Sequence, residues 1–335
     1  MTRRNNARRL KLAVSILLSL GLIAAAVLIP FPYYLYQPGT VEKLSDYVLV
    51  ENGKPSANDS FNLTTVYSIK VNNALTLLYG LISKDTEIHR ADQIRGALTD
   101  GEYLSLLKHM MGSSQNNAMS AALRAAGMPA QAVYTGVFVR SLAEGSKAAG
   151  VIAPGDVIVE ADGKPVTRLS ELSELIGDGR RVPLTVELSE SVAADGKGTT
   201  MPRIGIVTED QYTIETPVKI EYAASDIGSP SAGFMFALEI LDQLTDGELT
   251  RGKFVAGTGT IDAEGNVGQI GGIRDKLIAA ERAGVELFFC PADVKASDRN
   301  EKDIRDEAKR RGDDITIVPV RTPAEAAAYL ERLEG

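Results

Sequence analysis

The first long apolar run of the chain lies at residues 12–29. It carries no charge, and only two serines and one glycine interrupt its aliphatic composition. A run of 18 residues is close to the length that a membrane-spanning helix needs. Positively charged flanks stay in the cytoplasm. The pattern therefore predicts a cytoplasmic segment over 1–11, a transmembrane anchor over 12–32 and an extracytoplasmic body from residue 33. Five positive charges precede the run: Arg3, Arg4, Arg8, Arg9 and Lys11.

A cleaved signal peptide is the competing interpretation of this run. The alanines at 24–26 could supply a small-residue cleavage site. We favour an uncleaved anchor at the cell membrane, because the apolar run continues past these alanines. Tyr33, Tyr34 and Tyr36 follow it, where an interfacial belt of aromatic residues is expected. Under either interpretation the body of the protein is exported.

Beyond the anchor, the apolar positions change their spacing several times. Residues 61–69 are rich in β-branched and aromatic residues and predict a strand. Residues 73–82 predict a short apolar helix. A longer helix is predicted to begin after Thr99, to break at Gly112 and to stop at Gly127. These elements belong to a predicted N-terminal region over 33–119.

Residues 120–200 predict a β-rich domain. Two turn signals bracket one of its strands, Pro154-Gly155-Asp156 and Asp162-Gly163. A small polar stretch at 191–198 predicts a domain boundary or the tip of a hairpin. The remaining predicted elements are strands at 136–139 and 182–188 and a helix at 169–176.

Residues 201–335 alternate between strand and helix patterns and predict a second domain. Residues 234–244 are almost wholly apolar, so this helix is predicted to be buried on nearly all sides. The complete chain therefore predicts an α+β fold behind an N-terminal transmembrane helix. Further predicted elements are strands at 204–207, 217–222, 253–261, 285–290 and 315–320, and helices at 273–283, at 301–311 and from Pro323 onward.

Charge and composition exclude several classes of function. The net charge of the chain is −8, and without the five N-terminal positive charges the remaining chain carries −13. Such an acidic body argues against a nucleic-acid partner. Cys290 is the only cysteine, which excludes an intramolecular disulfide and a cysteine metal cluster. Its apolar strand suits a small buried residue. His89 and His109 lack a second ligand at metal spacing, so no metal site is predicted.

A candidate nucleophile lies at the start of the apolar helix. Ser229 fits the N-cap position and Pro230 the first helical position, so Ser231 is left without a capping role. Backbone N–H groups at a helix start have no intrahelical partner, and those of Ser231 and Ala232 could hold an oxyanion. Ala232 and Gly233 are expected to leave space for a substrate backbone.

A serine nucleophile needs a base, and a histidine base is excluded in this domain because no histidine follows His109. A lysine can serve when burial or a positive field lowers its pKa. Lys276 lies in the first helical turn after two glycines, where the helix dipole disfavours a positive charge. Its neighbours Arg274 and Asp275 are expected to be solvated.

The β-rich domain resembles the PDZ domain of bacterial exported proteases over residues 120–200. The resemblance rests on a small-residue turn ending at Gly150, followed by Gly155-Asp156 and Asp162-Gly163 at the family's spacing. It implies that a peptide adds as a strand beside the first strand, with Gly136, Val137 and Phe138 in the peptide-binding loop. A PDZ domain that only packs or gates is the open alternative.

The C-terminal domain resembles the proteolytic domain of the Lon family, which uses a Ser-Lys dyad. Pro230-Ser231-Ala232-Gly233 matches the nucleophile motif, and residues 268–280 match the lysine motif. The resemblance implies that Ser231 is the nucleophile and Lys276 the general base. Thr258 matches a threonine whose hydroxyl orients the lysine. Ser229 departs from the family, whose members more often carry glycine there.

The order of anchor, PDZ domain and Lon-type domain resembles the exported, PDZ-containing Lon-like proteases of Gram-positive bacteria. It implies a membrane-anchored serine endopeptidase that cleaves peptides or unfolded proteins, as a possible homo-oligomer. The sequence has no Gly-x-x-x-x-Gly-Lys-Ser/Thr motif, so cleavage without ATP and without a cofactor is expected. The alternative is a catalytically silent PDZ and Lon-like scaffold at the membrane surface.

Overall fold

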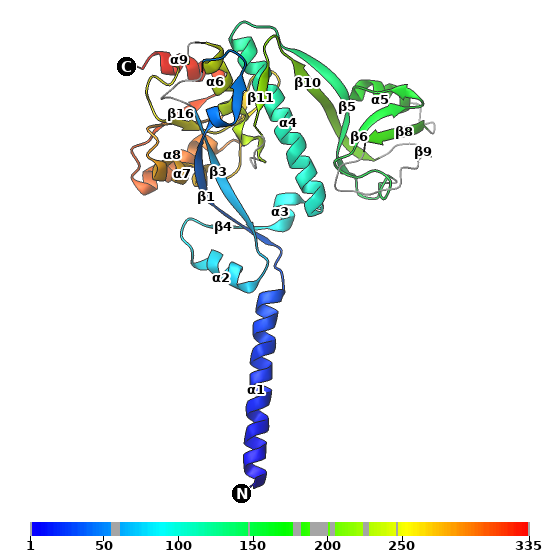
Figure 1. Ribbon diagram of the computed structural model, residues 1–335, viewed down its shortest axis with the longest axis vertical. Helices are drawn as coiled ribbons and strands as arrows, with labels where there is room; N and C mark the ends of the chain where they lie inside the picture. The colour runs from blue at the N-terminus through cyan, green and yellow to red at the C-terminus, as the bar shows by residue number, and fades with distance from the viewer. Residues whose placement is uncertain are drawn as a thin grey trace. The chain divides into compact units, whose positions relative to one another are not determined.

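The chain forms two compact units, which consist of residues 1–39 with 66–97 and residues 40–65 with 98–335. Figure 1 shows the helices and strands of both units. Strands β1 (Tyr33–Lys43) and β3 (Asn62–Lys70) each run from one unit into the other. The computed structural model describes residues 2–54, 61–146, 148–176, 182–187, 200–201, 205–223, 228–245 and 247–333.

The smaller unit begins with helix α1 (Thr2–Leu28). Its segment Lys11–Leu28 is long and apolar enough to cross a membrane, with a mean hydropathy of 2.3 and no burial inside the protein. Length and composition are the only support for this, and a signal sequence would meet the same criterion. The helix can thus serve as a membrane span, and its orientation stays a prediction.

The rest of the smaller unit is built on the first residues of β1. Strand β4 (Glu87–Arg90) pairs with them in antiparallel fashion, and the short helix α3 (Ala91–Arg95) follows. The predicted short helix is confirmed as α2 (Ala74–Ile82). Its start is fixed by Asn73, whose side chain accepts a hydrogen bond from the Thr76 N–H at 2.8 Å.

The candidate site is carried by four neighbouring strands of a six-stranded sheet with the order β16-β15-β12-β3-β1-β4. Strand β12 (Val255–Gly257) lies parallel to β3 on one side and to β15 (Leu287–Pro291) on the other. Strand β16 (Thr316–Val320) continues the sheet in parallel beyond β15. All five residues of β15 are buried, as expected for a parallel strand that is covered on both faces.

Alternate residues of these strands enter two different apolar cores. Phe289 and Val318 belong to the core that contains helix α6 (Gly233–Leu244) and helix α9 (Pro323–Glu331). Phe288 and Cys290 belong to the core on the opposite face, and the helices there are α7 (Ile273–Ala283) and α8 (Asn300–Arg311). The predicted burial of the α6 helix is confirmed, because residues 233–243 are all buried.

Helix α4 (Asp100–Ala125) packs against α6 and completes the first core. A capping box between Thr99 and Glu102 starts the helix, and Gly127 follows its end with a φ of +71°, as predicted. The predicted break at Gly112 is wrong. A glycine inside a helix costs only about 1 kcal/mol, and the packing of α4 against α6, α9 and β10 outweighs that cost.

The predicted β-rich domain has its own sheet and its own core. Strand order is β10-β5-β6-β8-β9, with β7 beside β6, and helix α5 (Leu169–Ile176) packs with the core. Asp162 and Gly163 both adopt positive φ and form the predicted hairpin turn between β6 and β7. The strands are β5 (Gln131–Leu142), β6 (Val157–Ala161), β7 (Lys164–Pro165), β8 (Val182–Glu187), β9 (Thr200–Met201) and β10 (Ile206–Glu215).

The structure adds two observations on the predicted domain boundaries. Strand β10 lies beyond the predicted boundary at residue 200 and still pairs with β5. The predicted hairpin tip at 191–198 lies outside the described residues.

The remaining elements are η1 (Leu44–Asp46), β2 (Val48–Val50) paired with β11 (Ile220–Tyr222), η2 (Pro230–Ala232), and β13 (Thr260–Ile261) paired with β14 (Val267–Gly268).

Candidate active site

The predicted nucleophile lies in a single turn of 3-10 helix, η2, directly before α6. The prediction that Ser229 caps this turn is confirmed, since its side chain accepts a hydrogen bond from the Ser231 N–H at 3.4 Å. Pro230 takes the first helical position, as expected. The α-helix itself begins two residues after Ser231, which is buried with 9 % of its surface exposed.

Lys276 reaches the same turn from helix α7. Gly272 precedes this helix in the left-handed conformation, with a φ of +68° that favours glycine. The Lys276 amine lies 2.7 Å from the Ser231 hydroxyl and 2.8 Å from the Thr258 hydroxyl. The side chain is 4 % exposed. Burial disfavours its charged form and lowers the pKa of Lys276 to about 7.

Thr258 lies where the strand predicted over 253–261 is interrupted. The Thr258 N–H still donates to the Phe289 carbonyl at 3.0 Å, but the next N–H, that of Gly259, donates to the Ser231 carbonyl at 2.8 Å. The Thr258 hydroxyl also donates to that carbonyl, at 3.0 Å. The chain leaves the sheet here to hold the turn that carries Ser231, and the strand resumes as β13.

The three side chains define one direction of proton movement. Because the Thr258 hydroxyl donates its proton to the Ser231 carbonyl, its lone pair is available to the Lys276 amine. In the neutral form of that amine, the nitrogen lone pair can accept the Ser231 hydroxyl proton along the 2.7 Å contact. The arrangement can thus generate a serine nucleophile near neutral pH.

Ser229 makes a contact that its capping role does not explain. Its hydroxyl lies 2.9 Å from the Ser231 hydroxyl. When Ser231 directs its proton to Lys276, Ser229 must be the donor in this contact. The sequence could not reveal this geometry, because the capping position alone accounts for a serine there.

Helix α4 supports the turn from a distant part of the sequence. The Ser114 hydroxyl donates to the Pro230 carbonyl at 2.9 Å. A side-chain carbon added to Gly233 would lie 2.1 Å from the Ser114 oxygen, so glycine is required for this close approach. The expectation that Gly233 leaves room for a substrate is therefore wrong, because α4 occupies that space.

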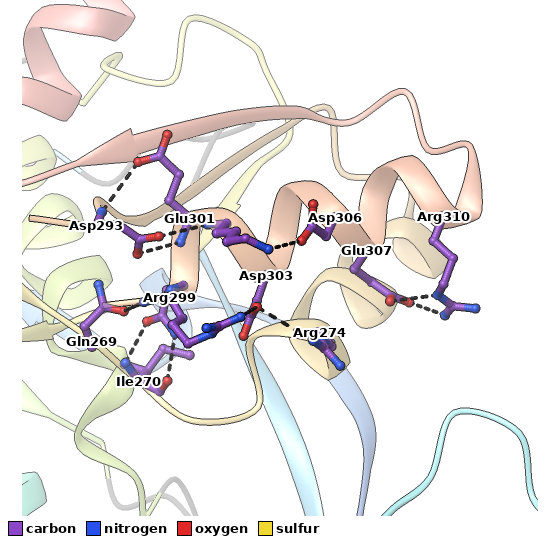
Figure 2. Close-up of polar contacts among 12 residues, drawn as sticks. Gln269, Ile270, Arg274, Asp293, Arg299, Glu301, Asp303, Asp306, Glu307 and Arg310 are labelled. Atoms are coloured by element: carbon purple, nitrogen blue, oxygen red, sulfur yellow. Dashed lines mark hydrogen bonds and ion pairs between the residues drawn. The ribbon is translucent and has the colours of Figure 1, made fainter. Parts of the chain in front are cut away.

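A polar cluster fixes the segment that leads into the lysine helix (Figure 2). Asn300 forms two hydrogen bonds with the backbone of Ile270, accepting from its N–H at 2.8 Å and donating to its carbonyl at 3.0 Å. The Gln269 side chain accepts from the Arg299 and Asn300 N–H groups at 3.1 and 2.9 Å. The start of α8 thus positions the entry to α7.

We predict that Asn300→Ala lowers the free energy of unfolding by about 1–2 kcal/mol, because it leaves two part-buried backbone groups of Ile270 without their partner. Urea unfolding of the purified protein measures this change. Lys302→Ala on the exposed side of α8 is the control and should shift stability by less than about 0.5 kcal/mol. Equal unfolding midpoints for Asn300→Ala and wild type would contradict the positioning role.

We predict that Thr258→Val reduces kcat roughly 10- to 100-fold, because it removes one hydrogen bond to the lysine amine and one to the Ser231 carbonyl. Thr258→Ser keeps the hydroxyl and is the control, with kcat close to wild type. Steady-state turnover of a peptide substrate compares the two. An orienting role is excluded if valine and serine give the same rate.

The two charged neighbours of Lys276 differ in their exposure. Asp275 is buried rather than solvated. It lies in the first turn of α7, where the helix dipole favours an acid. Arg274 is half exposed, as expected, and pairs with Asp303 at 3.7 Å.

No group of three or more His, Cys, Asp or Glu side chains in the described part of the chain could hold a metal ion.

Gly136, Val137 and Phe138 do not form the predicted peptide-binding loop. All three lie inside strand β5, where β10 pairs with one edge. Strand β6 pairs with the other edge at Val137 and Phe138. An added peptide strand therefore has no free backbone edge there. The sequence missed this because the pairing with β10 joins residues about 70 positions apart.

His109 packs against the β-rich domain, and Cys290 follows its predicted role as a small buried residue. The His109 ring stacks on Phe138 at 3.6 Å, and its Nε2 atom lies 2.7 Å from the Glu209 carboxylate. Cys290 is fully buried, and burial raises the pKa of its thiol to about 12. His109 nevertheless connects α4 to the β5–β10 pair, a contact that its helical pattern did not indicate.

Comparison with known proteins agrees with the two motif regions. Residues 198–330 match the Lon protease (S16) C-terminal proteolytic domain, and residues 138–188 match a PDZ domain. A Lon protease of Neorickettsia sennetsu is 35% identical over 127 residues, which are 38% of this chain and 14% of that protein. A Lon protease of Roseiflexus castenholzii is 29% identical over 168 residues, which are 49% of this chain and 19% of that protein.

A third relative, a Lon protease of Koribacter versatilis, is 31% identical over 162 residues, which are 46% of this chain and 19% of that protein. The matched part thus spans less than one fifth of the length of each of these relatives. Together with the mixed helix and strand content, the matches define what the chain carries: a Lon protease C-terminal proteolytic domain and a PDZ domain.

Proposed function

We propose that this protein is a membrane-anchored serine endopeptidase that cleaves exported or unfolded proteins without ATP. The observation that carries the proposal is the buried Lys276 amine, 2.7 Å from the Ser231 hydroxyl, with a pKa lowered to about 7. A lysine that is neutral near pH 7 can act as a general base. The match of residues 198–330 to a Lon protease proteolytic domain supports peptidase chemistry.

In the proposed reaction, the Ser231 oxygen attacks the carbonyl carbon of the scissile peptide bond while its proton moves to Lys276. The resulting oxyanion would be held by the backbone N–H groups of Ala232 and Ser231, and the Ser231 N–H would exchange its 3.4 Å bond to the Ser229 hydroxyl for this role. Lys276 then gives the proton to the leaving amine, and the C–N bond breaks. Water, deprotonated by Lys276, hydrolyses the acyl ester and restores the serine hydroxyl.

The PDZ domain would recruit or gate substrates in this proposal. Strand β10 ends the order of its sheet, so its outward edge, rather than β5, is where a peptide strand could pair. Helix α5 borders β10, since the Leu169 N–H donates to the Asp210 carboxylate at 2.6 Å. Part of the edge is covered already, because Asn116 of α4 donates to the Tyr212 carbonyl at 2.6 Å.

Anchoring and ATP independence complete the proposal. The apolar segment Lys11–Leu28 supports a single membrane span with the body on the extracytoplasmic side. Independence of ATP is supported by the sequence, which contains no phosphate-binding Gly-x-x-x-x-Gly-Lys-Ser/Thr motif. A protease that faces away from the cytoplasm would also lack a supply of the nucleotide.

The test is casein degradation by the full chain in detergent, with and without ATP and Mg²⁺. We expect peptide products at the same rate in both conditions. A nucleotide-dependent rate would contradict ATP independence alone. Complete absence of products, together with no labelling of the protein by a serine-reactive fluorophosphonate between pH 6 and 9, would instead favour a catalytically silent PDZ scaffold.

A further inference from the structure

We propose that helix α2 is a second membrane contact, lying along the bilayer surface with its outer face among the lipids. This inference rests on the anchoring part of the proposed function and is independent of the peptidase chemistry. It concerns the smaller unit alone, in which α2 and α1 are in contact. Four observations carry it: the fixed orientation of α2, its exposed apolar stripe, its lack of charge and its place beside α1.

The inner face of α2 is fixed to strand β1. Gly80 is buried against Leu35, and a side-chain carbon added there would lie 2.5 Å from the leucine. The Gln37 amide donates to the hydroxyl groups of Tyr79 in α2 and of Ser83 at its C-cap, at 3.1 and 3.4 Å. These contacts determine which side of the helix faces β1 and which side faces outward.

The outward side carries a continuous apolar stripe. Leu75, Leu78 and Ile82 follow the spacing of one helix face, and all three are exposed, Ile82 to 74 %. Leu81 extends the stripe and is 67 % exposed. Soluble surfaces rarely expose apolar side chains in such a group, and larger patches mark contact sites. This face therefore requires a partner.

The partner must accept an uncharged, apolar helix. Residues 74–82 contain no charged side chain, and the nearest charges are Lys70 before the helix and Lys84 after it. A helix of nine residues is about 14 Å long, too short to cross a bilayer core of about 30 Å. A helix with these properties fits the interface between headgroups and acyl chains.

The position of α2 in the unit selects lipid over another protein surface. Strand β1, to which α2 is fixed, begins at Tyr33, five residues after α1 ends at Leu28. The candidate span Lys11–Leu28 has no burial inside the protein. Where α1 leaves a bilayer, α2 must therefore lie close to the lipid surface, with Tyr33 and Tyr34 at the level where aromatic side chains are favoured.

The buried state of Cys290 makes a labelling experiment specific. This sole cysteine is fully buried, and burial raises the pKa of its thiol to about 12, so an added surface cysteine reacts selectively. The full chain is reconstituted in phosphatidylcholine and phosphatidylglycerol vesicles as Leu78→Cys, labelled with a polarity-sensitive NBD dye. Val294→Cys is the matched control, since Val294 is 65 % exposed and stands alone among polar neighbours.

Leu18→Cys in α1 serves as the reference for membrane insertion. Spin-labelled lipids then quench whichever dye contacts the acyl region. We expect Leu78 to be quenched at least threefold more strongly than Val294, with blue-shifted emission. Ile82→Cys should repeat the result of Leu78.

Three outcomes would overturn the inference. Quenching at Leu78 equal to that at Val294, with Leu18 quenched, rejects the α2 contact and leaves the anchor intact. Blue-shifted emission at Leu78 without lipid quenching means that protein, such as a second copy of the chain, covers the face. Absence of quenching at Leu18 rejects the anchor and the α2 contact together, whereas casein turnover by the same samples reports the peptidase separately.

Discussion

Ser231→Ala is expected to reduce casein turnover by a factor on the order of 10⁴ to 10⁶, the range seen when a serine protease loses its nucleophile. The alanine removes the hydroxyl that lies 2.7 Å from the Lys276 amine and would attack the substrate. The fold should be kept, because one small buried hydroxyl is lost and the turn is still held by the Gly259 N–H. Turnover is measured alongside circular dichroism and urea unfolding.

Ser297→Ala is the matched control for this variant, since Ser297 is an exposed serine of the same domain. It should retain the turnover of wild type. Ser231→Ala with an intact fold and undiminished turnover would remove Ser231 from the reaction. It would leave Ser229, whose hydroxyl lies 2.9 Å away, as the next serine to test.

The second large effect is a rise of kcat/KM with pH through a midpoint of about 7. Burial lowers the pKa of Lys276 to about 7, so the amine is neutral above this pH and protonated below it. Only the neutral amine can take the serine proton. The rate should therefore be full above the midpoint and fall about tenfold for each pH unit below it. Peptide cleavage between pH 5 and 9 gives this profile.

Two lysine variants show whether the profile belongs to Lys276. Lys276→Met should be inactive at every pH, while Lys302→Met at an exposed position should keep the wild-type profile. Lys276→Met should also have a higher melting temperature than wild type at pH 6. At this pH the wild-type lysine is charged in the unfolded chain, and folding must either bury that charge or release the proton, which costs free energy that methionine does not. A wild-type rate that is flat, or that rises as pH falls, would contradict a lysine base.

The local parts of the site could be predicted from sequence because each depends on a short stretch of chain. Glycines fix both ends of helix α7, and Pro230 after Ser229 fixes the start of the nucleophile turn. These signals set the bounds of the helix that carries Lys276. They also assigned the capping role to Ser229 and left Ser231 as the candidate nucleophile, although the close contact between the two hydroxyl groups exists only in the folded turn.

The missed parts depend on contacts between distant segments. Ser114 precedes the Pro230 carbonyl that it binds by 116 residues, and no pattern in α4 indicates this bond. Strand β5 is paired on both edges only because β10, the last strand of the PDZ domain, returns to it. The burial of Asp275 likewise depends on what covers the first turn of α7, which a helical pattern does not reveal.

The path of the chain has a consequence for how the protein can be divided into fragments. The PDZ domain is inserted in the body that carries Ser231 and Lys276 rather than attached to one end of it. Strand β3 and helix α4 precede the PDZ domain, yet β3 pairs with β12 and α4 packs on α6. Phe61 and Met111 share one core with Phe234 and Phe289.

A fragment that begins at residue 198 would keep both Ser231 and Lys276 but lose β3, α4 and the Ser114 bond. It would expose the apolar face of α6 and the unpaired edge of β12 to solvent, which promotes aggregation. A minimal soluble fragment for activity measurements should instead delete α1 and shorten the PDZ insertion, with the two ends of the insertion rejoined by a linker.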